Sequence, residues 1–309
     1  MEHLVSLNDR SAKEITALLD LAARLKRRKG RGRELAGKIL ALVFQKPSMR
    51  TRVSFEAAMD RLGGSCIYLG PDEVGLGSRE PARDVARVLS RYVDGIVART
   101  FGHGDVEEMA RYATVPVING LSDRAHPCQA LSDLLTIRER CGRLRGLRLG
   151  YVGDGNNVLH SLMEGCARCG ISVTAAVPRG YEPEAAVVAA ARRAAQHGAT
   201  IIITDQPEAA AQESDVLYTD VWTSMGQEEE AVRRRHAFGA FQLNARLLAL
   251  AKPTCIVMHC LPAHRGEEIT DDVMEGPRSA VFEQAENRLY TAEAVLVTLM
   301  RQRAKKRKG

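Results

Sequence analysis

The sequence lacks the features that would place it in a membrane or direct it across one. No window is apolar enough to span a bilayer. The start, Met1 to Arg10, has no apolar core of the signal-peptide kind, and its acidic residues argue against a transit peptide. We therefore expect a cytoplasmic protein that has no membrane partner.

Aromatic residues are scarce, at 5% of the chain, and none are interleaved with basic residues to form a stacking platform for single-stranded nucleic acid. The net charge of +6 is consistent with either a nucleic-acid partner or an anionic small substrate. Much of the basic excess lies in Lys26 to Lys29 and in the tail Arg301 to Lys308, and such runs are usually solvated surface. We expect no nucleic-acid partner; strongly salt-dependent binding of RNA or DNA would support the alternative.

Cysteines occur seven times, an odd number that in a long chain indicates reduced thiols in the cytosol. Cys166 and Cys169 have the C-x-x-C spacing of a zinc site, but no second pair is placed to complete it. Both lie in an apolar helical pattern, so we interpret them as packing residues. We expect no metal and no organic cofactor.

Strands and helices alternate along the chain, and 309 residues favour two domains over a single core. This alternation predicts parallel sheets with right-handed crossovers. The fold class is therefore α/β, with two doubly wound parallel-sheet domains and the active site in the cleft between them, beyond the carboxyl ends of the strands. The predicted strands are Ile39–Phe44, Ser65–Leu69, Gly95–Ala98, Val115–Ile118, Leu147–Val152, Ser172–Val177, Thr200–Thr204, Val216–Thr219 and Cys255–Met258.

A polar, glycine-flanked segment from Cys141 to Gly146 is a plausible hinge between domains at 1–141 and 146–289. Ser11 begins a capping box for a first helix, and Pro81 is predicted as the first residue of another. The apolar pattern of the last helix runs from about Ala292 to Lys305.

The stretch Phe44 to Glu56 combines features of an anion site. Pro47 ends a buried strand, and Ser48 is a good N-cap for the helix that follows. Free backbone N–H groups and the positive end of the helix dipole meet there, and Arg50 adds a cation. The pattern predicts a site for a phosphate-like dianion, although an ordinary turn with a surface arginine is the simpler alternative.

Further polar residues follow other strands. Arg99 ends one strand, and His126 lies in a strand-end loop three residues before Gln129, which favours a ligand-facing role over a structural one. Asp220 is either a loop cap or a ligand-binding carboxylate. Cys260 could be a nucleophile or a buried small residue.

A glycine loop, Gly153 to Gly155, follows the first strand of the second half and invites a dinucleotide interpretation. That signal is weak, because the third glycine is missing and no acidic residue closes the next strand.

Taken together, the motifs resemble those of the aspartate/ornithine carbamoyltransferase family over essentially the whole chain. The stretch Ser48-Met49-Arg50-Thr51-Arg52 is similar to the Ser-Thr-Arg-Thr-Arg loop that binds carbamoyl phosphate, and residues 126–129 match His-Pro-x-Gln. The segment Asp220 to Gly226 is similar to the Asp-Val-Trp-x-Ser-Met-Gly motif of the ornithine members, and His259 to Pro262 is similar to the family's His-Cys-Leu-Pro motif.

The resemblance implies a role for each matching residue. It places Arg50, Arg99, His126, Cys260 and Arg288 in catalysis. It implies contacts with carbamoyl phosphate from Ser48, Met49, Arg50, Thr51, Arg99, His126, Gln129, Cys260, Leu261 and Arg288, and contacts with ornithine from Asn157, Asp220, Ser224 and Met225. It also implies that a C-terminal helix, residues 290–309, packs back on the first domain, which would bind carbamoyl phosphate, while the second would bind ornithine.

The expected reaction is carbamoyl transfer from carbamoyl phosphate to the δ-amine of L-ornithine, giving L-citrulline and phosphate, in a homotrimer or a multiple of it. Acetylornithine or putrescine remains possible as acceptor, and aspartate is disfavoured. Three residues depart from the family pattern. Met49 replaces a usual threonine. Gly75 stands where many members have a glutamine that reaches the neighbouring subunit, so Ser78 or Arg79 would have to substitute. Gln45 stands where the ornithine enzymes often have a glutamate.

Overall fold

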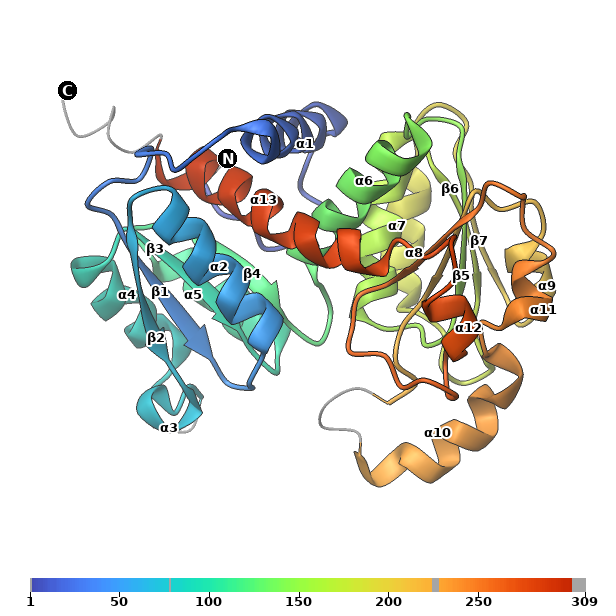
Figure 1. Cartoon of the computed structure of the whole chain (residues 1–309). Helices are drawn as coiled ribbons and strands as arrows, with labels where there is room; N and C mark the ends of the chain where they lie inside the picture. Colours follow the sequence, from blue (N-terminus) through green and yellow to red (C-terminus); the bar gives the residue numbers. More distant parts are fainter. Residues whose placement is uncertain (1, 78, 224–227, 302–309) are drawn as a thin grey trace. The chain divides into compact units, whose positions relative to one another are not determined.

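The structure, a computed structural model, describes residues 2–77, 79–223 and 228–301, and its strands and helices alternate as expected (Figure 1). The first half contains α1 (Ala12–Arg27), β1 (Ile39–Phe44), α2 (Met49–Arg61), β2 (Ser65–Leu69), α3 (Pro71–Val74), α4 (Ala82–Tyr92), β3 (Gly95–Arg99), α5 (His103–Tyr112), β4 (Val117–Leu121) and α6 (Pro127–Cys141). The second half contains β5 (Arg148–Val152), α7 (Asn157–Cys169), β6 (Ser172–Ala176), α8 (Ala185–Ala194), β7 (Ile201–Thr204), α9 (Pro207–Ala211), β8 (Val216–Thr219), η1 (Glu228–Glu230), α10 (Ala231–Phe238), η2 (Gly239–Phe241), α11 (Ala245–Leu248), β9 (Ile256–His259), α12 (Asp271–Met274) and α13 (Val281–Met300).

The chain divides into two compact units. The first comprises the residues up to Leu131 and those from Arg288 onward, and the second comprises Ser132–Asn287. The points of division therefore fall inside α6 and α13, whereas the sequence places the boundaries in the polar segment after Cys141 and after residue 289.

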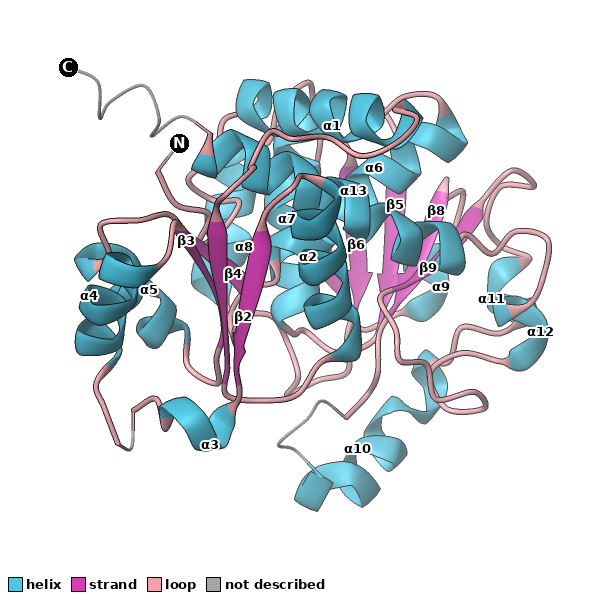
Figure 2. Ribbon diagram, turned by 60° about the vertical axis from the view of Figure 1, so that its left-hand side comes forward, coloured by secondary structure: helices cyan, strands magenta, loops and turns pink. Residues whose placement is uncertain are grey.

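In the first unit the described strands form a four-stranded parallel sheet in the order β2-β1-β3-β4. Helices α4 and α5 cover one face, as Figure 2 shows, and their side chains share an apolar cluster with β1, β3 and β4. The last turn of α13 lies near the other face, where a Cβ added at Gly95 would meet the Met300 sulfur at 3.2 Å and Leu40 at 3.3 Å. Strand β2 lies on one side of β1, and β3 and β4 lie on the other, so the switch point in the strand order falls between β1 and β3. Ligands bind at the switch point in folds of this kind.

In the second unit the described strands form a five-stranded parallel sheet in the order β7-β6-β5-β8-β9. Residues of α9, α10, α11 and α12 build an apolar cluster with β5, β8 and β9, centred on Trp222, Phe238 and Phe241. Here the switch point in the strand order falls between β5 and β8. The two sheets confirm the predicted fold class of two parallel α/β domains.

The sequence predicted the central strands well and some element ends wrongly. The N-caps at Ser11 and Ser48 are confirmed, and each side chain accepts a hydrogen bond from the first helical turn. Pro81 is an N-cap and not the first residue of α4. Strand β4 runs from Val117 to Leu121, later than predicted, and Leu4 bridges to its Ile118.

The last helix also begins earlier than its apolar pattern indicates, at Val281, and ends at Met300. Arg288 therefore lies within α13 instead of before it. Glu293 of this helix accepts a 2.5 Å hydrogen bond from Arg61 of α2. The predicted continuation to residue 305, and to 309 by resemblance, lies outside the described residues. Among the residues that the structure describes, no helix is long and apolar enough to cross a membrane.

Candidate functional site

The anion-binding stretch begins where β1 ends. Ser48 caps α2: its Oγ accepts the N–H of Thr51 at 3.3 Å and donates to Thr51 Oγ1 at 3.1 Å. Met49 and Arg50 are the first helical residues, so their N–H groups lie at the positive end of the helix dipole. The Met49 side chain is 69% exposed, so its departure from threonine leaves the backbone of this turn intact.

Three of the predicted residues of the first unit meet around a fourth, Arg288. Its Nη2 donates to Thr51 Oγ1 at 2.9 Å, and its Nη1 donates to Gln129 Oε1 and lies 3.5 Å from His126 Nε2. All four side chains are buried. These residues come from α2, the start of α6 and α13, which are far apart in sequence, and they form one hydrogen-bonded group.

His126 is surrounded by positive charge. Burial is the largest cause that lowers the pKa of His126 well below its usual value. The positive charges of Arg288, Arg99, Lys46 and Arg50 lower it further. The ring is therefore neutral at pH 7. Because an arginine nitrogen only donates, His126 Nε2 accepts from Arg288, and the ring proton lies on Nδ1. A neutral imidazole amid four cations suits a site for a phosphate-like anion.

Lys46 is a member of this cationic group that the motifs did not single out. Burial, and then the charge of Arg99, lowers its pKa. Its ammonium lies 5.0 Å from the centre of the Phe101 ring. The neighbouring Gln45 accepts the Phe101 N–H at 2.6 Å and donates to Leu76 O at 2.9 Å, so it braces the loops after β1 and β3.

Gly75, the second departure, ends the short helix α3 with φ of +56°. A Cβ at this position would come within 2.7 Å of the Arg79 Cβ. Glycine is thus required by the local backbone, which a glutamine would strain. Ser78 lies outside the described residues.

In the second unit, Asp220 joins two loops at the carboxyl ends of β5 and β8. Asn156 caps α7 by accepting the N–H groups of Val158 and Leu159, at 3.0 and 3.2 Å. Its Nδ2 donates to Asp220 Oδ2 at 2.8 Å. Asn157, which the resemblance places at the substrate, is the first residue of α7 and half-buried.

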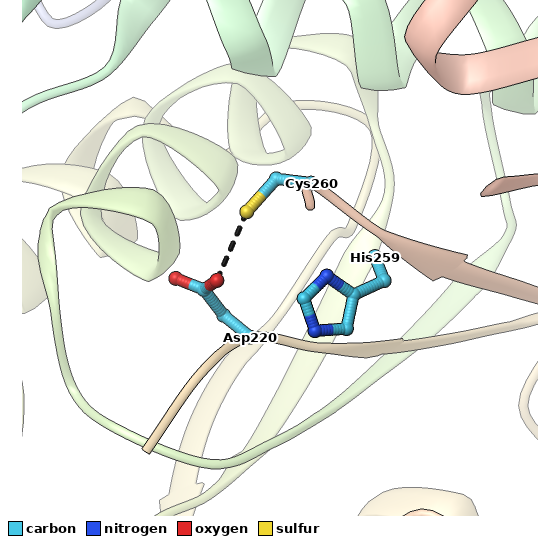
Figure 3. A group of neighbouring side chains, drawn as sticks. All are labelled: Asp220, His259 and Cys260. Carbon is cyan, nitrogen blue, oxygen red and sulfur yellow. Dashed lines mark hydrogen bonds between the residues drawn. The ribbon is translucent and has the colours of Figure 1, made fainter. Parts of the chain in front are cut away.

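Cys260, immediately after β9, points at the same carboxylate (Figure 3). Its thiol donates to Asp220 Oδ1 at 2.9 Å, and the Val221 N–H donates to the same oxygen, also at 2.9 Å. The Asp220 side chain therefore receives an amide, a thiol and a backbone N–H. This arrangement suits recognition of a cationic amine by the carboxylate, with the thiol beside it.

His259 lies next to Asp220 and Cys260, and the three side chains come close enough together to suggest a metal site. Both ring nitrogens of His259 are already used: Nδ1 accepts the Leu261 N–H at 2.9 Å, and Nε2 lies 3.1 Å from Glu268 Oε1. The ring would have to leave both partners to bind a metal. The residues present therefore fit a metal site poorly.

The structure thus gathers Ser48, Arg50, Thr51, Arg99, His126, Gln129 and Arg288 in one unit and Asp220, Cys260 and Leu261 in the other. Ser224 and Met225 lie outside the described residues. The resemblance covers the pair Asn156-Asn157 but implies a substrate contact for Asn157 only, whereas in the structure Asn156 bonds to Asp220. Sequence reasoning missed Glu268, which had no signal because its partner His259 lies nine positions away.

Comparison with known proteins matches both halves of the chain. Residues 2–139 match the carbamoyl-P binding domain of aspartate/ornithine carbamoyltransferase, and residues 145–299 match the Asp/Orn binding domain. The ornithine carbamoyltransferase of Acidothermus cellulolyticus is 58% identical over 304 residues, which cover 97% of each chain. An anabolic ornithine carbamoyltransferase from Pyrococcus furiosus is 52% identical, covering 96% of each chain. The solved structure of ornithine carbamoyltransferase from P. furiosus superposes with a TM-score of 0.94 and covers 97% of each chain.

Fold and site together define an α/β protein of two parallel-sheet domains, each with its polar side chains gathered at the carboxyl edge of a sheet. The family matches cover both of these domains. The chain belongs to the aspartate/ornithine carbamoyltransferase family.

Proposed function

We propose that this protein transfers the carbamoyl group of carbamoyl phosphate to the δ-amine of L-ornithine, giving L-citrulline and phosphate. The observation that carries the proposal is the cationic group around the neutral His126, which suits an anionic carbamoyl donor. The carboxylate of Asp220 beside the Cys260 thiol, in the other unit, suits an amine acceptor. The names of the relatives support ornithine as that acceptor.

On the donor side, Ser48, Thr51 and the first N–H groups of α2 hold the phosphate, with Arg50 and Arg99 as counter-ions. Arg288, Gln129 and His126 face the carbamoyl group. Attack on the carbonyl carbon builds negative charge on its oxygen, and these fixed donors stabilise that charge without having to reorganise. The carbon–oxygen bond to phosphate then breaks, and the proton lost by the attacking nitrogen leaves with the phosphate.

On the acceptor side, the δ-amine must be neutral to attack. Its pKa is lysine-like, so deprotonation at pH 7 costs about 4–5 kcal/mol. Burial disfavours the ammonium form and offsets part of this cost, and the Cys260 thiol and the Asp220 carboxylate orient the nitrogen. Holding both substrates in place supplies a large part of the remaining acceleration.

We further propose a biosynthetic role, a cytoplasmic location and a homotrimer. The word anabolic in the name of the P. furiosus relative supports the first. All seven cysteines are free, which supports a reducing compartment. Light scattering after gel filtration tests the third, and a monomer would overturn it.

The function is tested by offering ornithine, acetylornithine, putrescine and aspartate side by side with carbamoyl phosphate and measuring the carbamoylated product. We expect turnover with ornithine. Turnover with another amine alone would retain the carbamoyl-phosphate half and overturn the assignment of the acceptor loop at Asp220. No turnover with any acceptor would overturn the proposal as a whole.

A further inference from the structure

Arg234 of α10 is a buried arginine that none of the motifs includes. Its side chain is only 7% exposed, and its guanidinium contacts three separate segments. Nη1 donates to the backbone oxygen of Trp222 at 2.9 Å and lies 3.2 Å from Asp154 Oδ2. Nε donates to Glu230 Oε2 at 3.1 Å. Burying a guanidinium is costly unless it is paired and hydrogen-bonded, as it is here.

Aromatic rings fix the plane of the same guanidinium. Its central carbon lies 4.8 Å from the centre of the Tyr181 ring and 5.9 Å from that of Phe238. Those two rings pack edge to face at 4.8 Å, and Phe238 also lies 6.0 Å from Trp222. Stacking and a forked donor are properties that lysine lacks, so the site is specific for arginine.

The segments that Arg234 joins are the two that carry the acceptor residues. Asp154 belongs to the loop after β5, two residues before Asn156. Trp222 belongs to the loop after β8, two residues beyond Asp220. Asn156 and Asp220 are themselves joined at 2.8 Å. Arg234 thus closes a second link between the same loops.

We propose that Arg234 is a positioning residue for the acceptor substrate. By tying the Trp222 backbone to Asp154, it holds Asp220 and Asn156 in the geometry that binds the α-amino acid. This inference rests on the proposed function for the nature of the substrate, but the link itself is independent of it. Arg234 acts through Trp222 and Asp154 and touches no reacting atom.

A matched pair of variants tests the proposal. Arg234→Met keeps the length of the side chain and removes its charge and donors. Arg235→Met, on the next residue of α10, removes a guanidinium that is ion-paired to Glu267 but 58% exposed. For Arg234→Met we expect the KM for ornithine to rise about tenfold or more, the size of losing a charge-assisted hydrogen bond, with the KM for carbamoyl phosphate changed less than twofold. Arg235→Met should leave both constants unchanged.

The single tryptophan of the chain supplies a readout that does not depend on activity. Trp222 is 5% exposed, so acrylamide should quench its fluorescence weakly in the native protein and more strongly in Arg234→Met. L-norvaline, which has the carbon skeleton of ornithine without the δ-amine, should lower the quenching in Arg234→Met toward the native level.

The proposal is overturned if Arg234→Met has native KM values and native quenching. It is also overturned if both KM values rise together, because a general loss of structure, and not a change confined to the acceptor loops, then explains the effect. If Arg234→Met does not fold, Arg234→Lys keeps the charge without the fork and should still raise the KM for ornithine. Native kinetics in that variant would equally overturn the proposal. Failure of the native protein to use ornithine would refute the proposed function alone, since the quenching comparison still tests the link.

Discussion

His259 Nε2 lies 3.1 Å from Glu268 Oε1, and both side chains are fully buried. The Leu261 N–H donates to His259 Nδ1, so the ring proton lies on Nε2 and is donated to the carboxylate. Glu268 Oε1 also accepts the His264 N–H at 2.5 Å. One carboxylate oxygen therefore fixes the strand end and the turn on either side of Cys260.

Glu268→Ala should consequently reduce both stability and turnover. It removes the acceptor for the buried ring N–H of His259 and for the backbone N–H of His264, and we expect the free energy of unfolding to fall by about 2–4 kcal/mol. Urea denaturation and carbamoyl transfer are the measurements. Glu268→Gln, which retains a carbonyl oxygen, should lie much closer to the native protein. Equal behaviour of the two variants would contradict the role assigned to that oxygen.

Arg50→Ala should lower turnover by about 100-fold or more, because it removes a cation that would face the departing phosphate. Arg52→Ala is the control on the same helix. The Arg52 guanidinium pairs with Glu56 at 2.9 Å and stacks on Tyr68 at 3.9 Å. Steady-state kinetics with circular dichroism separates chemistry from folding. Near-native activity of Arg50→Ala would contradict the assignment of this loop.

The affinity for ornithine should weaken in acid. Burial raises the pKa of Asp154 to about 6, with Asp220 adding to the rise and Arg234 opposing it. The ion pair with Arg234 needs the carboxylate, so it is present above about pH 6 and lost below. The effect on stability has the opposite sign: since the folded pKa exceeds the usual 3.8, protonation of Asp154 favours the fold, and this contribution is lost as the pH rises through about 6.

The KM for ornithine measured from pH 5 to 8 checks this prediction. The native value should rise below about pH 6, and Asp154→Asn should lack that rise. Burial and the surrounding cations lower the pKa of His126 well below its usual value, so this ring gains its proton at a lower pH than a free histidine does. The Tyr151 hydroxyl, which faces the same loop, has a raised pKa and stays protonated. A native rise that persists in Asp154→Asn would assign the titration to another group.

Arg61 and Glu293 connect α2 to α13, and Glu293 is fully buried. Burial raises the pKa of Glu293, although Arg61 opposes the rise. Arg61→Ala should destabilise the protein by about 3–5 kcal/mol, because it leaves a buried carboxylate without its partner. Adding Glu293→Gln should recover part of that loss, since the remaining side chain is neutral. Chemical denaturation of the single and double variants gives the coupling, and strict additivity would contradict it.

Local signals predicted more of the structure than long-range ones. β1 and the Ser48 cap follow from an apolar run, a proline and a capping residue that are adjacent in sequence, and they were predicted correctly. The start of α13 was missed because its first turns contain polar residues. Two of them, Gln284 and Asn287, are buried, and they donate hydrogen bonds to Asp133 and Thr136 of α6. Such partners are 151 residues away, so no periodicity in the sequence reports them.

The site residues divide in the same way. His126, Asp220 and Cys260 stand out because each follows a strand, and chemistry is expected there. Arg234 and Glu268 occupy helices and turns that look like ordinary charged surface. Only the folded chain brings Arg234 to Asp154 and Glu268 to His259. Supporting residues of this kind are fixed by tertiary packing, which a single sequence does not contain.

Asn156, Asp220 and Cys260 come from the loops after β5, β8 and β9, which are neighbours in the sheet but lie far apart along the chain. Each loop is anchored at both ends by its own strand and helix. Because Asn156 and Cys260 both donate to Asp220, replacing the loop after β8 also removes the partner of the other two loops. A change of acceptor on this scaffold would therefore call for coordinated changes in three separate stretches of its gene.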